Sequence, residues 1–225
     1  MTVEHFGVKL IKKSKKLKLN REEFALINTK PSQPYSDSLS ERNAYVDDKG
    51  SAYREEWCKE YRELCLKNYD LNMQFFSSLD AEEFNNQLSA FLRRHKCFKK
   101  VHDLKEYAGV EGYYIIVLDE YKQVYIGKSN DIKKRMLRHW SSTLPFDRTL
   151  FPMYAYTRSC FSIDFFRAFD TTRIYAWKRR QAEGLEKELV ADFSPKYCTN
   201  RIGGDVSNAL EAIATINRRQ FEANS

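Results

Sequence analysis

Two short runs of β-forming residues, separated by four mostly polar residues, constrain the fold of this 225-residue chain most strongly. The first run follows Gly112 and has the sequence Tyr-Tyr-Ile-Ile-Val-Leu, and the second covers residues 123–127. Runs of β-branched and aromatic residues with a short polar break predict a β-hairpin. If residue 118 pairs with residue 123, Tyr114 and Tyr125 lie on one face of that hairpin, one diagonal step apart.

A helix is predicted directly after the hairpin. Its apolar stripe has four-residue spacing and consists of Ile132, Met136 and Trp140. Asn130 or Asp131 is expected to cap the first turn.

The same helix is predicted to carry a polar row. Arg135 and His139 are four residues apart and therefore share one face, and Asp131 begins that row. Two phenols on a sheet beside an Arg/His row form a polar set of the kind that handles phosphate. Each pair alone has an ordinary alternative, because strand tyrosines usually pack and such Arg/His pairs are usually solvated.

The C-terminal part continues this alternation of strands and helices. A third strand is predicted over residues 161–169, and a second helix over residues 176–193, stopped by Pro195. From Gly112 the order is therefore β-β-α-β-α. Together with a helical region before it, this order predicts an α+β protein with a small, mixed or antiparallel three-stranded sheet flanked by helices.

Two amphipathic helices are predicted ahead of the hairpin. Apolar residues recur at i, i+4, i+7 and i+8 from Trp57 and again from Phe84, and Asp80 with Glu83 forms a capping box. Such a pair more commonly supports a neighbouring core, although a DNA-binding pair has the same pattern. The predicted division is a basic arm and linker in residues 1–50, a helical accessory region in 51–110, a core in 111–204 and a C-terminal helix in 205–225.

Charge and cysteine content narrow the class of partner and compartment. The net charge is +7, with eight Lys/Arg against three Glu in residues 1–30 and eighteen against fourteen acidic residues in 111–225. This distribution favours a polyanion partner, and a basic surface kept for solubility explains it about as well. The five cysteines form no C-x-x-C pair, so we expect reduced thiols in a cytoplasmic protein. Neither a secretory leader nor an apolar run of membrane-spanning length is expected.

Several spaced elements resemble the GIY-YIG nuclease superfamily. Gly112-Tyr-Tyr114 is followed after eleven residues by Tyr125-Ile-Gly127, and then by Arg135 and His139. The central Ile of the first triplet is Tyr113 here.

A downstream segment resembles the part of the family that places a metal-binding Glu on a helix ahead of a Pro-x-Tyr-Asn-like motif. Here Glu186 precedes Pro195 by nine residues. Cys198 stands at the usual place of the Asn, and Asn200 follows two residues later. This departure concerns the substrate-ordering role and leaves the metal ligand and both tyrosines in place.

The resemblance implies a role for each matching side chain. Tyr114 would be the general base and Tyr125 would position it, Arg135 would bind the scissile phosphate, and His139 would assist or serve as the alternative base. Glu186 would hold Mg²⁺ or Mn²⁺, because a single carboxylate is a hard oxygen ligand. The competing carboxylates are those of Glu183 and Glu188, and the expected substrate-binding residues are Gly127, Lys128, Ser129 and Asn200.

The function that this implies is a divalent-metal-dependent endonuclease that hydrolyses phosphodiester bonds in DNA, of the restriction, defence, mobile-element or structure-specific type. One alternative is a non-catalytic nucleic-acid-binding regulator on a nuclease fold. Another is a toxin-like effector nuclease with an immunity or modification partner. A double-strand cut from one active site would require a homodimer or two successive cuts.

Overall fold

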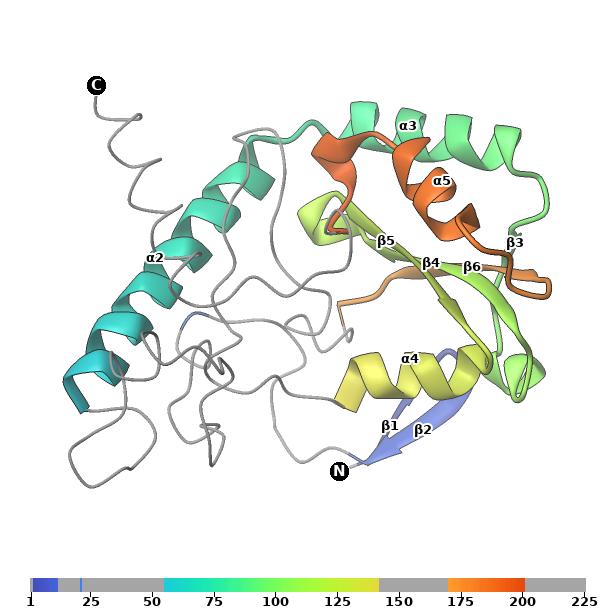
Figure 1. Cartoon of the computed structure of the whole chain (residues 1–225), viewed down its shortest axis with the longest axis horizontal. Helices are drawn as coiled ribbons and strands as arrows, with labels where there is room; N and C mark the ends of the chain where they lie inside the picture. Colours follow the sequence, from blue (N-terminus) through green and yellow to red (C-terminus); the bar gives the residue numbers. More distant parts are fainter. Residues whose placement is uncertain (1, 12–20, 22–54, 142–169, 201–225) are drawn as a thin grey trace.

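An antiparallel four-stranded sheet positions the other elements of the computed structural model, which describes residues 2–11, 21, 55–141 and 170–200. Its order is β3-β6-β4-β5, and neighbouring strands are antiparallel throughout (Figure 1). The predicted α+β class is confirmed, but the predicted three-stranded sheet is wrong by one strand. The bounds are β3 (Lys99–Lys100), β6 (Arg173–Lys178), β4 (Gly112–Leu118) and β5 (Gln123–Ser129).

The β4–β5 hairpin has the predicted register. Leu118 pairs with Gln123, and Tyr114 pairs with Gly127. A 3₁₀ turn over Asp119–Tyr121 and one left-handed residue, Lys122 with φ 52°, reverse the chain. The register brings the two tyrosines of the predicted site to one face, as expected.

The last residues of strand β6, 176–178, were wrongly predicted to be the start of a helix. In β6, Ile174 and Ala176 are buried while their neighbours Tyr175 and Trp177 are half-buried, which is the two-residue period of a strand. The helix α5 (Leu185–Ala191) therefore begins later than predicted. The predicted strand over 161–169 and helix over 205–225 lie outside the described residues.

The two helices predicted ahead of the hairpin are present as α2 (Glu55–Ser78) and α3 (Ala81–Arg94). The Asp80 side chain accepts a hydrogen bond from the Glu83 backbone N–H at 2.6 Å, so the predicted cap is confirmed. The buried stripe of α3 includes Phe84 and Phe91. The stripe predicted from Trp57 lies among side chains outside the described ones.

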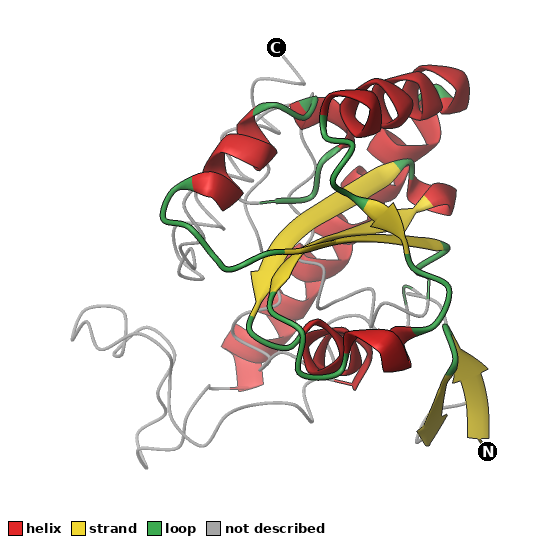
Figure 2. Ribbon diagram, turned by 90° about the vertical axis from the view of Figure 1, so that its right-hand side faces the viewer, coloured by secondary structure: helices red, strands yellow, loops and turns green. Residues whose placement is uncertain are grey.

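Helices cover both faces of the sheet (Figure 2). Helix α4 (Ile132–Ser141) packs below the sheet in Figure 1, whereas α3 and α5 lie above it. In the upper layer, Phe91 of α3 contacts Phe193, which follows α5, and Phe98, just before β3, contacts Trp177 of β6. The sheet is thus a middle layer whose two faces have separate surroundings.

The first residues form a hairpin, an element that the sequence did not predict within the basic arm. Strands β1 (Thr2–His5) and β2 (Val8–Ile11) are paired, and the Phe6 carbonyl accepts a hydrogen bond from the Leu104 N–H at 3.0 Å. The His5 ring lies 4.7 Å from that of Trp140 in α4. The strands are only four residues long and lie directly before the lysine cluster that begins at Lys12, so the sequence gives little local signal for them. The predicted linker falls outside the described residues.

The thiols and helices bear on two other expectations. Cys58, Cys97 and Cys198, which are the cysteines with described side chains, are not in disulfides. None of the helices in the described ranges combines the length and apolar character that crossing a bilayer demands.

The turn of the first hairpin gives a stability prediction. Gly7 and Gly109 both have positive φ, 73° and 69°, but only a Cβ at Gly7 would collide with the Asp103 carboxylate. Gly109→Ala should cost about 1–2 kcal/mol for the left-handed backbone alone. Gly7→Ala should cost at least about 1 kcal/mol more, because Asp103 must also give up its hydrogen bond to the Lys105 N–H. Urea unfolding of both variants measures the difference, and equal costs would show that the hairpin turn does not pack on Asp103.

Candidate functional site

The close approach of β4 and β5 forms the floor of the candidate site. Tyr114 is fully buried, and its ring lies 6.2 Å from that of the half-buried Tyr125. Gly127 lies opposite Tyr114, and a Cβ there would be 2.5 Å from the Tyr114 Oη and 2.9 Å from the Tyr125 Cε1. Only glycine at this position lets both phenols occupy the same patch of the sheet.

A turn after β5 starts helix α4 in the direction the site requires. The Ser129 hydroxyl donates to the Asp131 carbonyl at 2.8 Å and accepts from the Asp131 N–H at 3.0 Å. The Asp131 carboxylate then accepts from the Lys134 N–H at 2.8 Å. Asp131 is therefore the cap, which decides between the two predicted residues. The Ser129 hydroxyl, predicted to contact substrate, forms this turn.

Two side chains of α4 meet the buried phenol, as the four-residue spacing predicted. His139 Nε2 lies 2.9 Å from the Tyr114 Oη, and Arg135 Nε donates to the same oxygen at 3.3 Å. His139 is also buried, and its ring lies 5.4 Å from that of Tyr125. The four side chains come from one hairpin and one helix, so the local fold alone assembles them.

The electrostatics keep the Tyr114 phenol protonated. Burial raises its pKa well above the ordinary 10, and nearby Tyr125 and Glu186 raise it further, while Arg135 opposes these effects. Burial lowers the pKa of Arg135, but its contacts with the two phenols outweigh burial and the pKa is raised. A neutral Tyr114 that accepts from Arg135 keeps its own proton, which it can donate to His139 Nε2 in the tautomer that leaves this nitrogen unprotonated.

Helix α5 lies over the other face of the sheet (Figure 1), where Lys128 pairs with Tyr113, and brings a carboxylate close enough to raise the pKa of Tyr114. The Glu186 Oε2 lies 3.7 Å from the Lys128 Nζ, and their side chains are 29% and 40% exposed. Glu183 and Glu188, the predicted competitors, are exposed. Of the two carboxylates of α5, that of Glu186 is therefore the less exposed.

The candidate site offers a metal ion one protein carboxylate as a ligand, that of Glu186. The described part of the chain contains no cluster of three or more His, Cys, Asp or Glu side chains that could hold a metal. A single oxygen ligand that is partly open to water fits Mg²⁺ or Mn²⁺, which keep several waters, and does not fit a zinc site built from protein ligands. The donor set therefore fits the predicted ion at Glu186.

The side chain of Asn200 binds the backbone of β5. Its Oδ1 accepts from the Ile126 N–H at 2.8 Å, and its Nδ2 donates to the Ile126 carbonyl at 2.6 Å. The Cys198 thiol donates to the same Oδ1 at 3.2 Å. Asn200 therefore supports the strand that carries Tyr125, and its predicted substrate contact stays a prediction.

The sequence did not predict the role of Tyr113, which was noted only as a replacement of the central Ile of the first triplet. On the opposite face of β4, the Tyr113 hydroxyl accepts from the Ala182 N–H at 2.8 Å and lies 3.1 Å from the Ala182 carbonyl, to which it can donate. These bonds hold the loop that leads to Glu186. The signal in the sequence was that Tyr113 carries a hydroxyl at a position where the resembling family has an aliphatic Ile.

Substitution of the glycine in the floor tests the close approach. Gly127→Ala should lower the free energy of unfolding by about 1–3 kcal/mol, because the Tyr114 ring must move. The same substitution in a Tyr114→Leu background should cost less, since the ring that it displaces is gone. Chemical unfolding of the four proteins measures both costs, and equal costs would contradict the packing described.

A spectroscopic titration tests the protonation of Tyr114. The pKa of Tyr114 is higher in the folded chain than in the unfolded chain, where it is about 10. As the pH rises above about 10, the unfolded chain therefore loses this proton more readily, and the stabilisation that Tyr114 gives the folded state is lost. Phenolate absorbance of wild type and Tyr114→Phe should therefore be equal up to the alkaline unfolding transition. A phenolate present only in the wild type near neutral pH would overturn this assignment.

Similarity to other proteins gives no independent assignment of this site. Comparison of the chain with protein-family models, with curated protein sequences and with solved structures gave no match in any of the three. The functional argument therefore depends on the residues themselves: two phenols, a histidine and an arginine in contact, with a carboxylate and a lysine at their edge.

Proposed function

We propose that the chain is a divalent-metal-dependent endonuclease that hydrolyses phosphodiester bonds in DNA. The observation that carries the proposal is the contact of His139 and Arg135 with the Tyr114 hydroxyl. The motif spacing that resembles the GIY-YIG superfamily supports it, as does the net positive charge.

A proton relay reconciles this chemistry with the buried phenol. Tyr114 cannot act as a preformed phenolate, because its pKa is raised. With His139 Nε2 unprotonated and 2.9 Å away, Tyr114 would take a proton from the attacking water while it passes its own to the imidazole. This pathway uses both predicted bases, Tyr114 and His139, as one unit.

The cationic residues would bind the scissile phosphate. Arg135 stays charged at any working pH, and a guanidinium binds phosphate oxygens in a bidentate manner. Lys128, half-exposed next to Glu186, would contact a second phosphate oxygen. The partly exposed Tyr125 would orient the attacking water beside the relay.

Glu186 would hold the Mg²⁺ or Mn²⁺ ion. When bound, the ion would polarise the phosphate and stabilise the leaving oxygen. The Lys128 ammonium lies 3.7 Å from this carboxylate. When a metal ion binds, the ammonium would either share the carboxylate with the ion or move to the phosphate. The carboxylate, the lysine and the arginine would then surround the charge that develops in the transition state.

One observation favours a second candidate, a non-catalytic nucleic-acid-binding regulator. Tyr114 and His139 are both fully buried, and the half-buried members of the cluster are Tyr125 and Arg135. A buried Tyr-His-Arg network can also serve purely to stabilise the fold. Cleavage separates these two functions.

The decisive experiment incubates the protein with supercoiled, linear and branched DNA in Mg²⁺, in Mn²⁺ and in EDTA. Cutting should require the metal, and Tyr114→Phe and Glu186→Gln should each reduce the cleavage rate by about 10²–10⁴-fold, as expected for loss of a proton-transfer group or a metal ligand. Tyr175→Phe, on the other face of the sheet, and Glu188→Gln, exposed on α5, are matched controls that should cut like wild type.

Each result decides between the candidates. Cutting that survives EDTA or either site substitution would overturn the proposal. DNA binding without any cutting would favour the regulator. An RNA substrate run in parallel tests the choice of DNA.

A further inference from the structure

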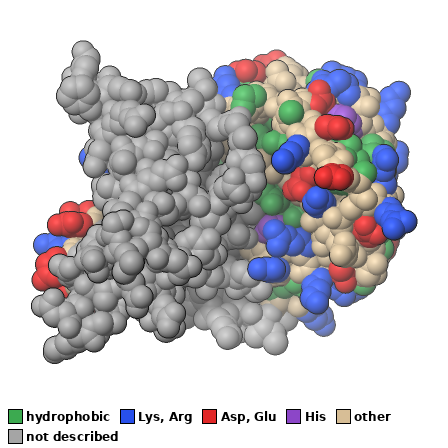
Figure 3. Space-filling model, in the orientation of Figure 1, with side chains coloured by type: hydrophobic (Ala, Val, Ile, Leu, Met, Phe, Trp, Pro, Cys, Tyr) green, Lys and Arg blue, Asp and Glu red, His purple; other side chains and the backbone are tan. Residues whose placement is uncertain are grey.

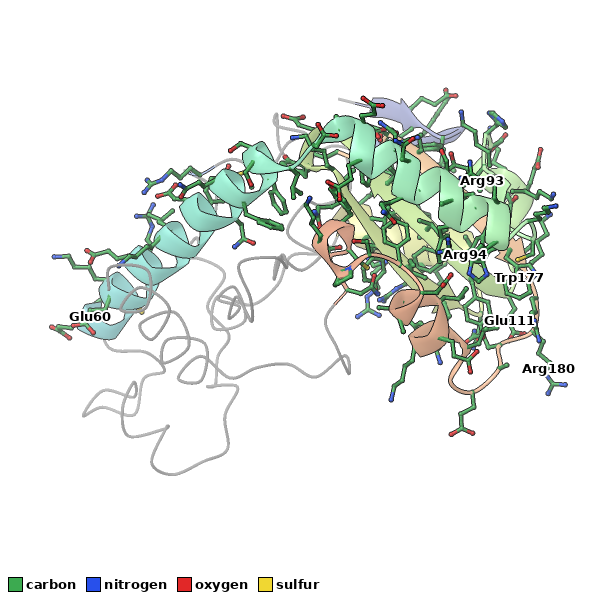
Figure 4. All side chains as sticks on the ribbon, turned by 90° about the horizontal axis from the view of Figure 1, so that it is seen from above. Glu60, Arg93, Arg94, Glu111, Trp177 and Arg180 are labelled. Atoms are coloured by element: carbon green, nitrogen blue, oxygen red, sulfur yellow. The ribbon has the colours of Figure 1, made fainter. Side chains whose placement is uncertain are left out.

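A group of cations lies at the end of the sheet formed by β3 and the end of β6. Figure 4 shows Arg93, Arg94, Trp177 and Arg180 together at this end, far from Glu60. Because β3 and β6 are antiparallel with Lys99 opposite Ala176, the residues before Lys99 run beside those after Ala176. We name this group the basic end; it comprises Arg93, Lys96, Lys99, Lys100, Arg179 and Arg180.

The basic end is exposed and has little acidic compensation. All six side chains are exposed, and within the described ranges none of them makes an ion pair. The nearby carboxylate of Glu111 accepts a hydrogen bond from the Gln181 N–H at 2.7 Å. In Figure 3, Lys and Arg side chains lie along the right-hand rim of the described face.

Packing fixes the position of one of these cations, Arg179. The Arg179 guanidinium lies 4.7 Å from the centre of the Trp177 ring, which in turn contacts Phe98 and Tyr113. The Arg179 N–H donates to the Glu111 carbonyl at 3.2 Å. A cation held in place loses less entropy when it binds than one on a free side chain.

The loop that carries two of these cations leads directly to the candidate site. Its residue Ala182 is bound by the Tyr113 hydroxyl, and the Gln181 amide contacts the Asn130 side chain, next to the start of α4. Two residues after the loop, α5 presents Glu186 beside Lys128. The basic end and the candidate site are thus joined by one tethered segment.

The separation between the basic end and the candidate site points to a polymer of phosphates. From β3, which carries Lys99 and Lys100, to β5, which carries Lys128, the sheet spans three strand spacings, about 14 Å. About 14 Å of duplex carries about eight phosphate charges, so a single phosphate or nucleotide would cover only a small part of that separation.

We propose that the basic end binds the phosphate backbone of DNA on one side of the bond that is cut. The assignment of that bond rests on the proposed function, whereas binding by the basic end does not require cutting. Exposed Lys and Arg side chains release counterions from several phosphates at once, and the tethered loop keeps that contact in register with Glu186.

The test measures the binding of a short labelled duplex by fluorescence anisotropy in EDTA, over a series of salt concentrations. The double variant Lys99→Gln/Lys100→Gln should raise Kd by at least about tenfold at low salt and reduce the slope of log K against log salt by about 1.8. Arg180→Gln should reduce the slope by about 0.9. The matched control is Lys59→Gln/Lys67→Gln, two exposed lysines of α2, with an unchanged slope expected. Thermal melting verifies that the variants fold.

The outcomes separate this inference from the proposed function. An unchanged slope in the Lys99/Lys100 double variant, an equal loss in the α2 control, or no DNA binding by the wild type would overturn the inference. A protein that shows the expected slopes but cuts no DNA in Mg²⁺ or Mn²⁺ loses the proposed function and keeps this one. A protein that cuts DNA while the double variant binds like wild type does the reverse.

Discussion

The pairing of Tyr114 with Gly127 is the constraint on which the candidate site depends. A bulky phenol can lie flat on this face only because the residue opposite has no side chain. The same pairing sets the position of Tyr125 two residues earlier. Helix α4 then follows within a few residues, so His139 and Arg135 reach the Tyr114 hydroxyl without any long-range adjustment.

The parts predicted correctly from the sequence are those set by local periodicity. The hairpin register follows from loop length and the two-residue strand period, and the shared face of Arg135 and His139 follows from helical spacing. The stripe of α3 and its cap at Asp80 are local in the same sense. For this reason the centre of the candidate site was predictable.

The parts missed from the sequence depend on contacts between distant segments. Strand β3 is two lysines long and exists because Ala176 and Tyr175 lie beside it. The first hairpin packs on Asp103 and Trp140, and no local sequence pattern predicts these contacts. Likewise, the role of the Tyr113 hydroxyl depends on Ala182, 69 residues away.

The segment after α5 has a consequence for how copies of this chain can associate. Thr199 donates its N–H to the Val124 carbonyl at 2.8 Å, and the Asn200 amide bonds to both backbone groups of Ile126, so the outer edge of β5 is already occupied. A covered edge offers no row of free backbone groups to a strand of another molecule. At the opposite edge, β3 offers only two residues, both lysines, whose like charges repel an identical copy. Within the described residues, this four-stranded sheet therefore offers a second copy few free backbone groups, either beside Val124 and Ile126 of β5 or along β3.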